Sequence, residues 1–343
     1  MRVIFSPRHR LHATETVTIH GEAYAETPPR AERLLAAAQA AGLGPVTEPA
    51  DHGLGPILAV HPADYVAFLR DGYPAGLPFR HAGPLVMADT FHTRHARRRP
   101  RHPWSQQGYY SFDIQAPLLA GTWEAAYWSA QCALTAADAV RAGAASAYAL
   151  CRPPGHHALA DQAGGFCYLN NAALAARHLQ AGAAAARVAI LDVDYHHGNG
   201  TQEIFYTDPS VLYVSLHGDP DEEYPFWWGG ADEQGAGAGQ GYNLNLPLPK
   251  GTDDARYLAA LDRALAAIAA FQPAWLVLSL GLDIGAGDPS ALGGGFAVTA
   301  AGFGQIGQRI AGLGRPTVIV QEGGYRLETL GENAAAVLRA FTG

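Results

Sequence analysis

Two adjacent histidines, His156 and His157, stand upstream of a short apolar run whose end carries Asp192, Asp194 and His196. Side chains alternate along a strand, so the last three residues would share one face if the run forms a buried strand. Polar groups on an apolar strand are costly unless they are paired or bind a metal. A carboxylate and an imidazole at this spacing would hold one divalent ion, and the two upstream imidazoles would be free to transfer protons. We therefore expect the site of a metal-dependent hydrolase.

Two later apolar runs supply further residues for this site. The run 275–282 is followed by Asp283, which we interpret as a third metal ligand. The run 316–320 precedes a pair of glycines and Tyr325, and the glycines allow a tight turn that would bring the Tyr325 hydroxyl over the metal. Two aspartates and one histidine leave an open coordination position, as in hydrolytic zinc sites, although this carboxylate-rich set also suits ferrous iron.

The composition of the 343-residue chain is that of a globular protein, with 48% hydrophobic and 16% charged residues. A formal net charge of −8 argues against nucleic acid as the main partner. No stretch approaches the ~18 apolar residues of a membrane span, and the N-terminal apolar run is too short for a secretory signal. The few cysteines lack disulfide or zinc-finger spacing, which favours a reducing, cytoplasmic location; they are Cys132, Cys151 and Cys167.

Short β-rich runs alternate with alanine-rich helical patterns along the whole chain. This alternation predicts an α/β protein with a parallel sheet and helices on both faces. No domain boundary interrupts the pattern, so we expect a single domain over residues 1–343. In such sheets the site lies beyond the carboxyl ends of the strands, where all the residues named above would meet. We expect strands over 3–5, 147–150, 188–193, 211–216, 276–280 and 318–320, and helices over 126–142, 172–180, 255–271 and 300–313.

The segment 74–107 is the irregular exception, with little hydrophobic periodicity and an arginine-rich run over 94–103. A charge run of this kind is usually a solvated loop. Long loops in compact folds often have a function, so a lid over the site or a contact between subunits is the alternative interpretation.

Six short motifs occur in one order along the chain, namely 152–157 (RPPGHH), 165–171 (GFCYLNN), 192–202 (DVDYHHGNGTQ), 215–217 (SLH), 288–289 (DP) and 322–325 (EGGY). In these motifs the chain resembles the histone deacetylase superfamily, and it is most similar to the bacterial acetylpolyamine amidohydrolases. The segments 1–6 (MRVIFS) and 121–125 (GTWEA) extend the likeness to that branch, and the similarity covers nearly the whole chain. The resemblance implies a single-domain, three-layer α/β/α arginase–deacetylase fold with a central parallel sheet.

The resemblance implies which residues hold ions. A zinc ion, with Fe²⁺ as the alternative, would bind Asp194, His196 and Asp283. A structural K⁺ ion is also implied, and backbone carbonyl groups would supply several of its ligands. The residues expected around K⁺ are Asp192, Asp194, His196, Ser215 and Leu216.

The resemblance also implies how the histidine pair would work. Asp192 would orient His156, and Asn199 would orient His157, which would act as the general base. Histone deacetylases usually have an aspartate where this chain has Asn199. A neutral amide does not favour a charged imidazolium as a carboxylate does, so we expect His157 to be the more readily neutral imidazole. Tyr325 would stabilise the oxyanion.

The substrate site implied by the resemblance is a narrow tunnel lined by Gly165, Phe166 and Tyr224. A polyamine substrate carries ammonium groups, which call for carboxylates or aromatic rings near the entrance. The positions that we match to acidic residues of the polyamine branch hold Trp104 and Gln115 instead.

We therefore expect a zinc-dependent deacetylase of small acetylated amines, such as acetylpolyamines, and a homodimer. The alternatives are a deacetylase of acetyl-lysine in proteins and a non-catalytic protein of the same fold that binds a metabolite.

Overall fold

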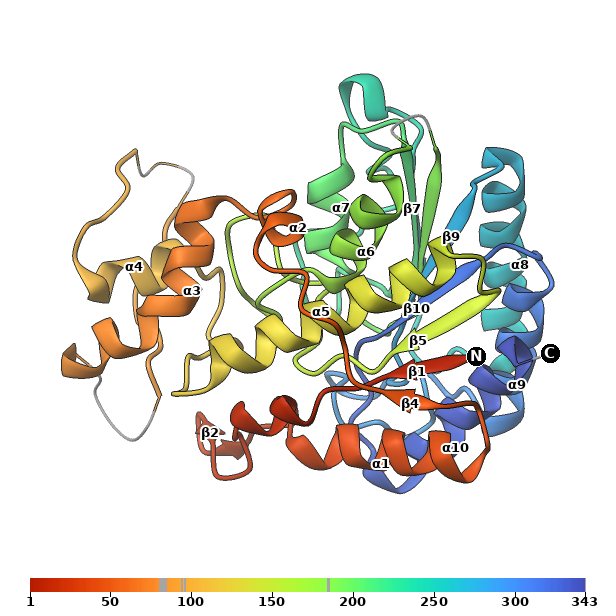
Figure 1. Cartoon of the computed structure of the whole chain (residues 1–343), viewed down its shortest axis with the longest axis horizontal. Coiled ribbons are helices and arrows are strands. Elements are labelled where there is room, and N and C mark those ends of the chain that lie inside the picture. The colour runs from red at the N-terminus through yellow and green to blue at the C-terminus, as the bar shows by residue number, and fades with distance from the viewer. Residues whose placement is uncertain (80–84, 94, 96, 184–185, 343) are drawn as a thin grey trace.

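A sheet of eight parallel strands forms the centre of the protein, in the order β4-β1-β5-β10-β9-β6-β7-β8 (Figure 1). This computed structural model describes residues 1–79, 85–93, 95, 97–183 and 186–342. The expected parallel sheet is confirmed, and β4 and β8 extend it beyond the strands expected from the sequence. The strands are β1 (Arg2–Ile4), β4 (Val46–Thr47), β5 (Ser146–Ala149), β6 (Val188–Asp192), β7 (Val211–Gly218), β8 (Asn243–Leu248), β9 (Trp275–Leu280) and β10 (Thr317–Gln321), with a separate hairpin of β2 (Thr18–Ile19) and β3 (Glu22–Ala23).

Helices cover both faces of the sheet, which gives the three-layer architecture that the sequence patterns predicted. Successive residues of β6 point to opposite layers: Ala189 and Leu191 pack with one set of helices, and Val188 and Ile190 pack with the other. Because both faces are buried, the strand is apolar at every one of these positions and does not alternate with polar residues. One layer contains α1 (Pro28–Ala40), α8 (Asp254–Phe271), α9 (Ala300–Ala311) and α10 (Leu327–Leu338); the other contains α5 (Thr122–Arg141), α6 (Asn171–Gln180) and α7 (Asn199–Phe205).

A smaller helical region packs against the first half of α5 and extends away from the sheet (Figure 1). It contains α2 (Gly55–Leu58), α3 (Ala63–Gly76) and α4 (Pro103–Tyr109). The expectation of an irregular segment over 74–107 was wrong at its two ends, because α3 continues through Pro74 and α4 covers the last residues. Residues 80–84, 94 and 96 of this segment lie outside the described residues.

The basic run is partly attached to this helical region. The guanidinium of Arg99 lies 3.0 Å from the carboxylate of Asp64, on α3, and 5.7 Å from the ring centroid of Tyr110. These contacts connect the run to the first turn of α3. In the described part of the chain, no helix combines the length with the apolar character needed to span a membrane.

Candidate active site

The three expected metal ligands meet beyond the carboxyl ends of β6 and β9, which are neighbours in the sheet. β6 ends at Asp192, so Asp194 and His196 lie in the following loop and not on the strand face that their alternation predicted. The chain turns there because Asp192 Oδ1 accepts a hydrogen bond from the Asp194 amide (3.1 Å), and Asp194 Oδ1 accepts one from the His196 amide (2.9 Å). Such bonds compete with strand pairing. Asp283 follows β9, and its Oδ1 accepts from the Tyr195 amide (2.9 Å).

The donor atoms of these ligands are close enough for one ion. His196 Nδ1 lies 3.1 Å from Asp283 Oδ2 and 3.4 Å from Asp194 Oδ1. One donor atom from each residue lies within 4.8 Å of the other two, and both carboxylates are fully buried. Bonds from zinc to such atoms are about 2.0–2.2 Å long, so donors on one ion are about 3–3.5 Å apart. The cluster therefore has the dimensions of a mononuclear metal site.

The electrostatics of the cluster also fit a cation. Burial and the neighbouring carboxylate of Asp194 raise the pKa of Asp283 to about 7. Burial alone would lower the pKa of His196, but hydrogen bonds with Asp194 and Asp283 outweigh it and raise this pKa to about 10. A divalent cation would relieve the repulsion between the buried carboxylates and replace the extra imidazole proton.

The two adjacent histidines have different hydrogen-bond partners. His156 Nδ1 lies 3.0 Å from Asp192 Oδ2, and His157 Nδ1 lies 2.8 Å from Asn199 Oδ1. The two ring centroids are 4.0 Å apart, and both side chains are buried. Each imidazole thus has one nitrogen occupied by the residue expected to orient it, which leaves Nε2 for other contacts.

The different surroundings move the pKa values of the two imidazoles in opposite directions. Burial alone would lower the pKa of His156, but the charges of Asp194 and Asp192 raise it to about 10. For His157, burial together with the positive charges of His156 and His196 lowers the pKa well below its usual range. The pair therefore divides into a protonated imidazole and a neutral one, and only the neutral one can accept a proton.

The loop that carries Tyr325 is hydrogen-bonded directly to the cluster of expected metal ligands. The Gly323 amide donates to Asp194 Oδ2 (2.8 Å), and the Tyr325 amide donates to Asp288 Oδ2 (2.7 Å). Between them, Gly324 has φ = +115°, which lies in the region that favours glycine. The glycine pair therefore makes the turn that the sequence predicted between β10 and Tyr325.

The three residues expected to line a tunnel lie beside the histidine pair and Tyr325. The ring of Tyr224 lies 5.0 Å from that of His157, and the ring of Phe166 lies 5.6 Å from that of Tyr325. At Gly165 a Cβ atom would come within 2.3 Å of the His157 ring, so only glycine fits there. The structure thus brings these residues together around the candidate centre.

Three of the residues expected around K⁺ lie on neighbouring strands, and the other two, Asp194 and His196, lie in the loop after β6. Asp192 of β6 is paired in register with Ser215 of β7, and Leu216 follows on the same strand. All three are buried, and Ser215 Oγ lies 2.9 Å from His217 Nδ1.

Two buried residues that were not among the expected site residues make hydrogen bonds to the segments that carry the site. Glu322 Oε2 accepts hydrogen bonds from the amides of Gly155 (2.7 Å) and His156 (3.1 Å). Burial raises the pKa of Glu322 to about 7. Arg30, on α1, donates to the carbonyl oxygens of Gly324 (2.5 Å) and Glu322 (2.9 Å). The motif at 322–325 marked Glu322, but nothing in the alanine-rich pattern of α1 marked Arg30.

Arg30 belongs to a buried ionic network. Glu26 Oε1 lies 2.9 Å from Arg30 Nη1 and 2.8 Å from Arg152 Nε. Burial alone would raise the pKa of Glu26, but the two guanidinium groups outweigh it and lower this pKa. Arg152 also donates to the carbonyl oxygens of His9 (2.6 Å) and His12 (2.9 Å), so the network ties the N-terminal segment to the strand end before His156.

A second group of potential ligands lies on the outer side of α5 and α6. The carboxylate of Asp138 lies 2.8 Å from His178 Nε2 and 3.7 Å from His52 Nδ1. The same carboxylate lies 2.8 Å from the guanidinium of Arg141, which already neutralises it. We interpret this group as a surface ion-pair network.

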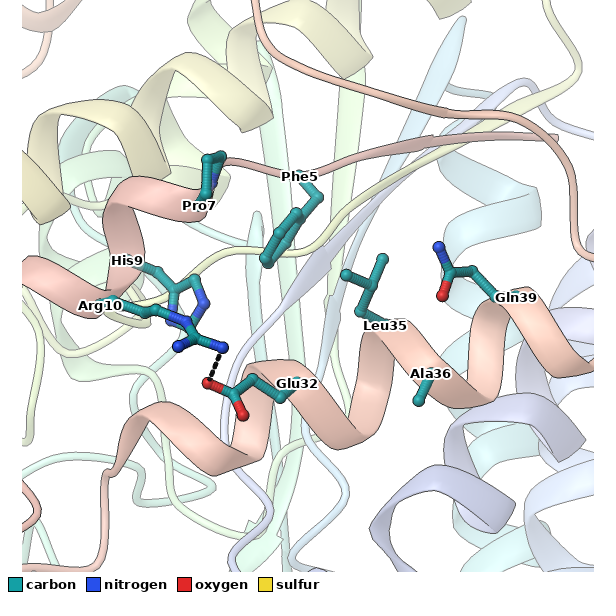
Figure 2. Close-up of a pocket in the computed structure, with 8 residues that line it drawn as sticks. All are labelled: Phe5, Pro7, His9, Arg10, Glu32, Leu35, Ala36 and Gln39. Atoms are coloured by element: carbon teal, nitrogen blue, oxygen red, sulfur yellow. Dashed lines mark ion pairs between the residues drawn. The ribbon is translucent and has the colours of Figure 1, made fainter.

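A surface hollow of about 420 Å³ lies between the N-terminal 3₁₀ helix η1 (Pro7–Leu11) and α1 (Figure 2). Arg10 and Glu32 form an ion pair of 2.8 Å at its side. None of its lining residues belongs to the candidate centre; they are Phe5, Pro7, His9, Arg10, Glu32, Leu35, Ala36 and Gln39.

Comparisons with known proteins agree with the resemblance seen in the motifs. Residues 24–341 match the family model of the histone deacetylase domain. The chain is 47% identical to acetylpolyamine amidohydrolase 1 of Pseudomonas aeruginosa, over 100% of this chain and 99% of that protein. It is 49% identical to the acetylpolyamine amidohydrolase of Burkholderia pseudomallei, over 99% and 98% of the two chains.

Solved structures give the same result. A crystal structure of acetylpolyamine aminohydrolase from Burkholderia pseudomallei superposes with a TM-score of 0.93 at 48% sequence identity, and the match covers 99% of this chain and 98% of that chain. The family expected from the sequence is confirmed. The chain therefore belongs to the histone deacetylase family.

Proposed function

We propose that the protein is a metal-dependent amidohydrolase that removes acetyl groups from small acetylated amines such as acetylpolyamines. The full-length similarity to two acetylpolyamine amidohydrolases supports this substrate class. One structural relationship carries the proposal: a neutral imidazole, His157, lies next to a protonated one beside a buried cluster of metal-ligand type. Hydrolysis of an amide needs both a base for water and stabilisation of negative charge, and this arrangement supplies both.

In this proposal Asp194, His196 and Asp283 hold Zn²⁺, with Fe²⁺ as the alternative that the same donors accept. When bound, the ion supplies a Lewis acid for the acyl carbonyl group and lowers the pKa of a water molecule. The repulsion between the two buried carboxylates supports the assignment, since an unpaired buried charge is costly.

The protons are moved by the histidine pair. His157 Nδ1 donates its hydrogen to Asn199, so Nε2 carries the lone pair and accepts the proton of the attacking water. His157 then returns this proton to the departing amine, which is a poor leaving group until it is protonated. His156, whose Nδ1 atom is held by the Asp192 carboxylate, stabilises the negative charge that develops on the acyl oxygen.

The remaining site residues bind the acyl group. The Tyr325 hydroxyl donates a hydrogen bond to the oxyanion. Phe166 and Tyr224 enclose the acyl chain between their rings, and the Gly165 carbonyl accepts a hydrogen bond from the substrate amide. The ring contacts of Phe166 with Tyr325 and of Tyr224 with His157 support this assignment.

The proposal includes a structural K⁺ ion beside Asp192, Asp194, His196, Ser215 and Leu216. The register of β6 with β7, which sets Asp192 opposite Ser215, supports it. It also includes a homodimer, with the segment 74–107 of the single domain 1–343 as lid or subunit contact. Sedimentation in solution tests the dimer, and melting in K⁺ against Na⁺ buffer tests the ion.

The function is tested by measuring kcat/KM of zinc-loaded protein for acetylspermidine, acetylcadaverine and an acetyl-lysine peptide. We expect the two small amines to be hydrolysed with the higher kcat/KM. A preference for the peptide would indicate a protein deacetylase instead. Zinc bound at one equivalent without hydrolysis of any amide would indicate a binding protein.

A further inference from the structure

The carboxylate of Asp113 connects two segments that flank the candidate centre. Its Oδ2 atom accepts hydrogen bonds from the Tyr224 hydroxyl (2.6 Å) and from the Gly165 amide (3.0 Å). Its Oδ1 atom accepts from the amide of Gln115 (2.8 Å), which fixes the carboxylate in the turn between α4 and α5. A single side chain thus joins the loop after β7 to the loop before α6.

One of these segments has a strained backbone. Gly165 has φ = +52° and Phe166 has φ = +68°, and the second value is unfavourable for a residue with a Cβ atom. Strain of this kind persists only where surrounding contacts impose it, and it occurs often at functional sites. The hydrogen bond from the Gly165 amide to Asp113 is one such contact.

The same turn also reaches Phe166 through Tyr24. The Tyr24 hydroxyl donates to the carbonyl oxygen of Gln115 (2.5 Å), and the Tyr24 ring lies 4.9 Å from the Phe166 ring. Asp113 therefore holds the backbone next to Phe166, and Gln115 holds Tyr24, whose ring contacts the Phe166 ring.

The Asp113 carboxylate has no cationic partner among the ion pairs of the described residues. Burial raises its pKa, although the bonds from Tyr224, Gln115 and Gly165 act in the opposite direction. Asp113 is half-buried. A carboxylate that is partly removed from water without a counter-ion has a desolvation cost, and the three donors directed at it offset this cost.

We propose that Asp113 is a positioning residue that sets the distance between Phe166 and Tyr224, and thereby selects the length of the acyl group. Tyr224 and Phe166 lie on the two segments that Asp113 joins, and their rings contact His157 and Tyr325. Loss of the connection would let these rings move apart, so acetyl would lose its advantage over longer acyl groups. The inference depends on the proposed amidohydrolase function.

The test compares the wild type with Tyr224→Phe, Asp113→Asn and the double variant. The substrates are acetyl, propionyl and butyryl amides of one amine. Tyr224→Phe removes only the hydroxyl and keeps the ring beside His157. For Tyr224→Phe we expect the KM for the acetyl amide to rise about tenfold, because a hydrogen bond to a charged group is lost. The kcat of this variant should stay within about twofold of the wild-type value. The ratio of kcat/KM for acetyl over butyryl should fall by about the same factor.

The double variant decides whether the two residues act through each other. If Asp113 positions Tyr224, then Tyr224→Phe should add less than about twofold in the Asp113→Asn background. The matched control is Glu203→Gln, because Glu203 also accepts from an aromatic side chain, Trp228 Nε1 at 3.1 Å, without touching Gly165 or Tyr224. This variant should keep the wild-type acyl preference.

Two results would overturn the inference while leaving the proposed function intact. One is an unchanged acetyl-to-butyryl ratio in both single variants. The other is a loss of activity that parallels a loss of bound zinc or of thermal stability, since Asp113 would then act through the fold. Absence of hydrolysis by the wild-type protein itself would contradict the proposed function instead.

Discussion

The guanidinium carbon of Arg30 lies 4.4 Å from the centroid of the Tyr325 ring. The same guanidinium donates to the carbonyl oxygens on both sides of the glycine pair, those of Glu322 and Gly324. Arg30 therefore holds the Tyr325 loop by two hydrogen bonds and stacks on the ring that the loop presents. This arrangement links α1 to the residue that we assign to the oxyanion.

Arg30→Lys should lower kcat by about tenfold, because an ammonium group cannot make the two directed bonds and the stacking contact together. Bound zinc should be unchanged, since among the contacts of the described residues Arg30 has none with the three proposed zinc ligands. Steady-state kinetics with metal analysis checks both statements. Arg10→Lys is the control, because Arg10 makes an exposed ion pair with Glu32 beside the hollow of Figure 2. Wild-type kcat in Arg30→Lys would show that the loop is held without this residue.

Tyr325→Phe should reduce kcat by about 10²–10³-fold, which is the usual effect of removing one oxyanion donor. The ring would keep its contacts with Arg30 and Phe166, so the loop and the zinc content should not change. Single-turnover kinetics with zinc analysis checks this expectation. A variant that retains more than half of the wild-type kcat would remove Tyr325 from the mechanism.

Asp283→Ala should abolish both tight zinc binding and turnover. Asp283 is one of only two carboxylates among the proposed donors, and its Oδ2 lies 3.1 Å from His196 Nδ1. Zinc per chain after gel filtration is the measurement. Asp262→Ala serves as control, because Asp262 lies in an ion pair with Arg309 (3.1 Å) on the outer surface. An unchanged zinc stoichiometry in Asp283→Ala would exclude Asp283 as a ligand.

His61 should make the protein less stable as the pH falls below about 6.5. His61 Nδ1 lies 2.8 Å from the Ala160 carbonyl oxygen, and Nε2 accepts from the Asn170 amide, so the ring is held neutral. Burial lowers its pKa to about 4. Between pH 6.5 and 4 the unfolded chain binds a proton that the folded chain excludes. The free energy of unfolding therefore decreases as the pH is lowered, by up to ~1.4 kcal/mol per pH unit.

His61→Gln keeps a donor and an acceptor but does not titrate. Between pH 6.5 and 5, urea unfolding should therefore show a loss of stability about 1.5 kcal/mol smaller in this variant than in the wild type. Equal losses in the two proteins would show that His61 does not contribute to acid sensitivity.

The sequence predicted the parallel sheet and the convergence of the candidate site residues, because both depend on local patterns. Apolar runs predicted β6, β7, β9 and β10, and polar residues at the ends of such runs must converge at one edge of the sheet. The expected extent of β6 was wrong, because the carboxylates of Asp192 and Asp194 accept hydrogen bonds from nearby amides, and the strand ends earlier than alternation suggests. Helix and strand propensities and hydrophobic periodicity do not reveal this competition between side-chain hydrogen bonds and strand pairing.

Local sequence patterns could not predict contacts between residues that are far apart in the sequence. Arg30 is distant in sequence from the Tyr325 loop, and α1 shows only alanine-rich helix propensity around it. No pattern in the sequence marked Asp113, because its bonds to Tyr224 and Gly165 depend on the folding of three separate loops. The left-handed backbone of Phe166 has no signal in a single sequence either.

The most direct test of the account is the release of acetate from acetylspermidine by zinc-loaded protein, metal-free protein and zinc-loaded His157→Ala. We predict one acetate per free amine with the zinc-loaded wild type and none without metal. His157→Ala should bind zinc normally and release acetate about 10²–10⁴-fold more slowly, because it lacks the proton acceptor. Release at the wild-type rate by the metal-free protein or by His157→Ala would contradict the account.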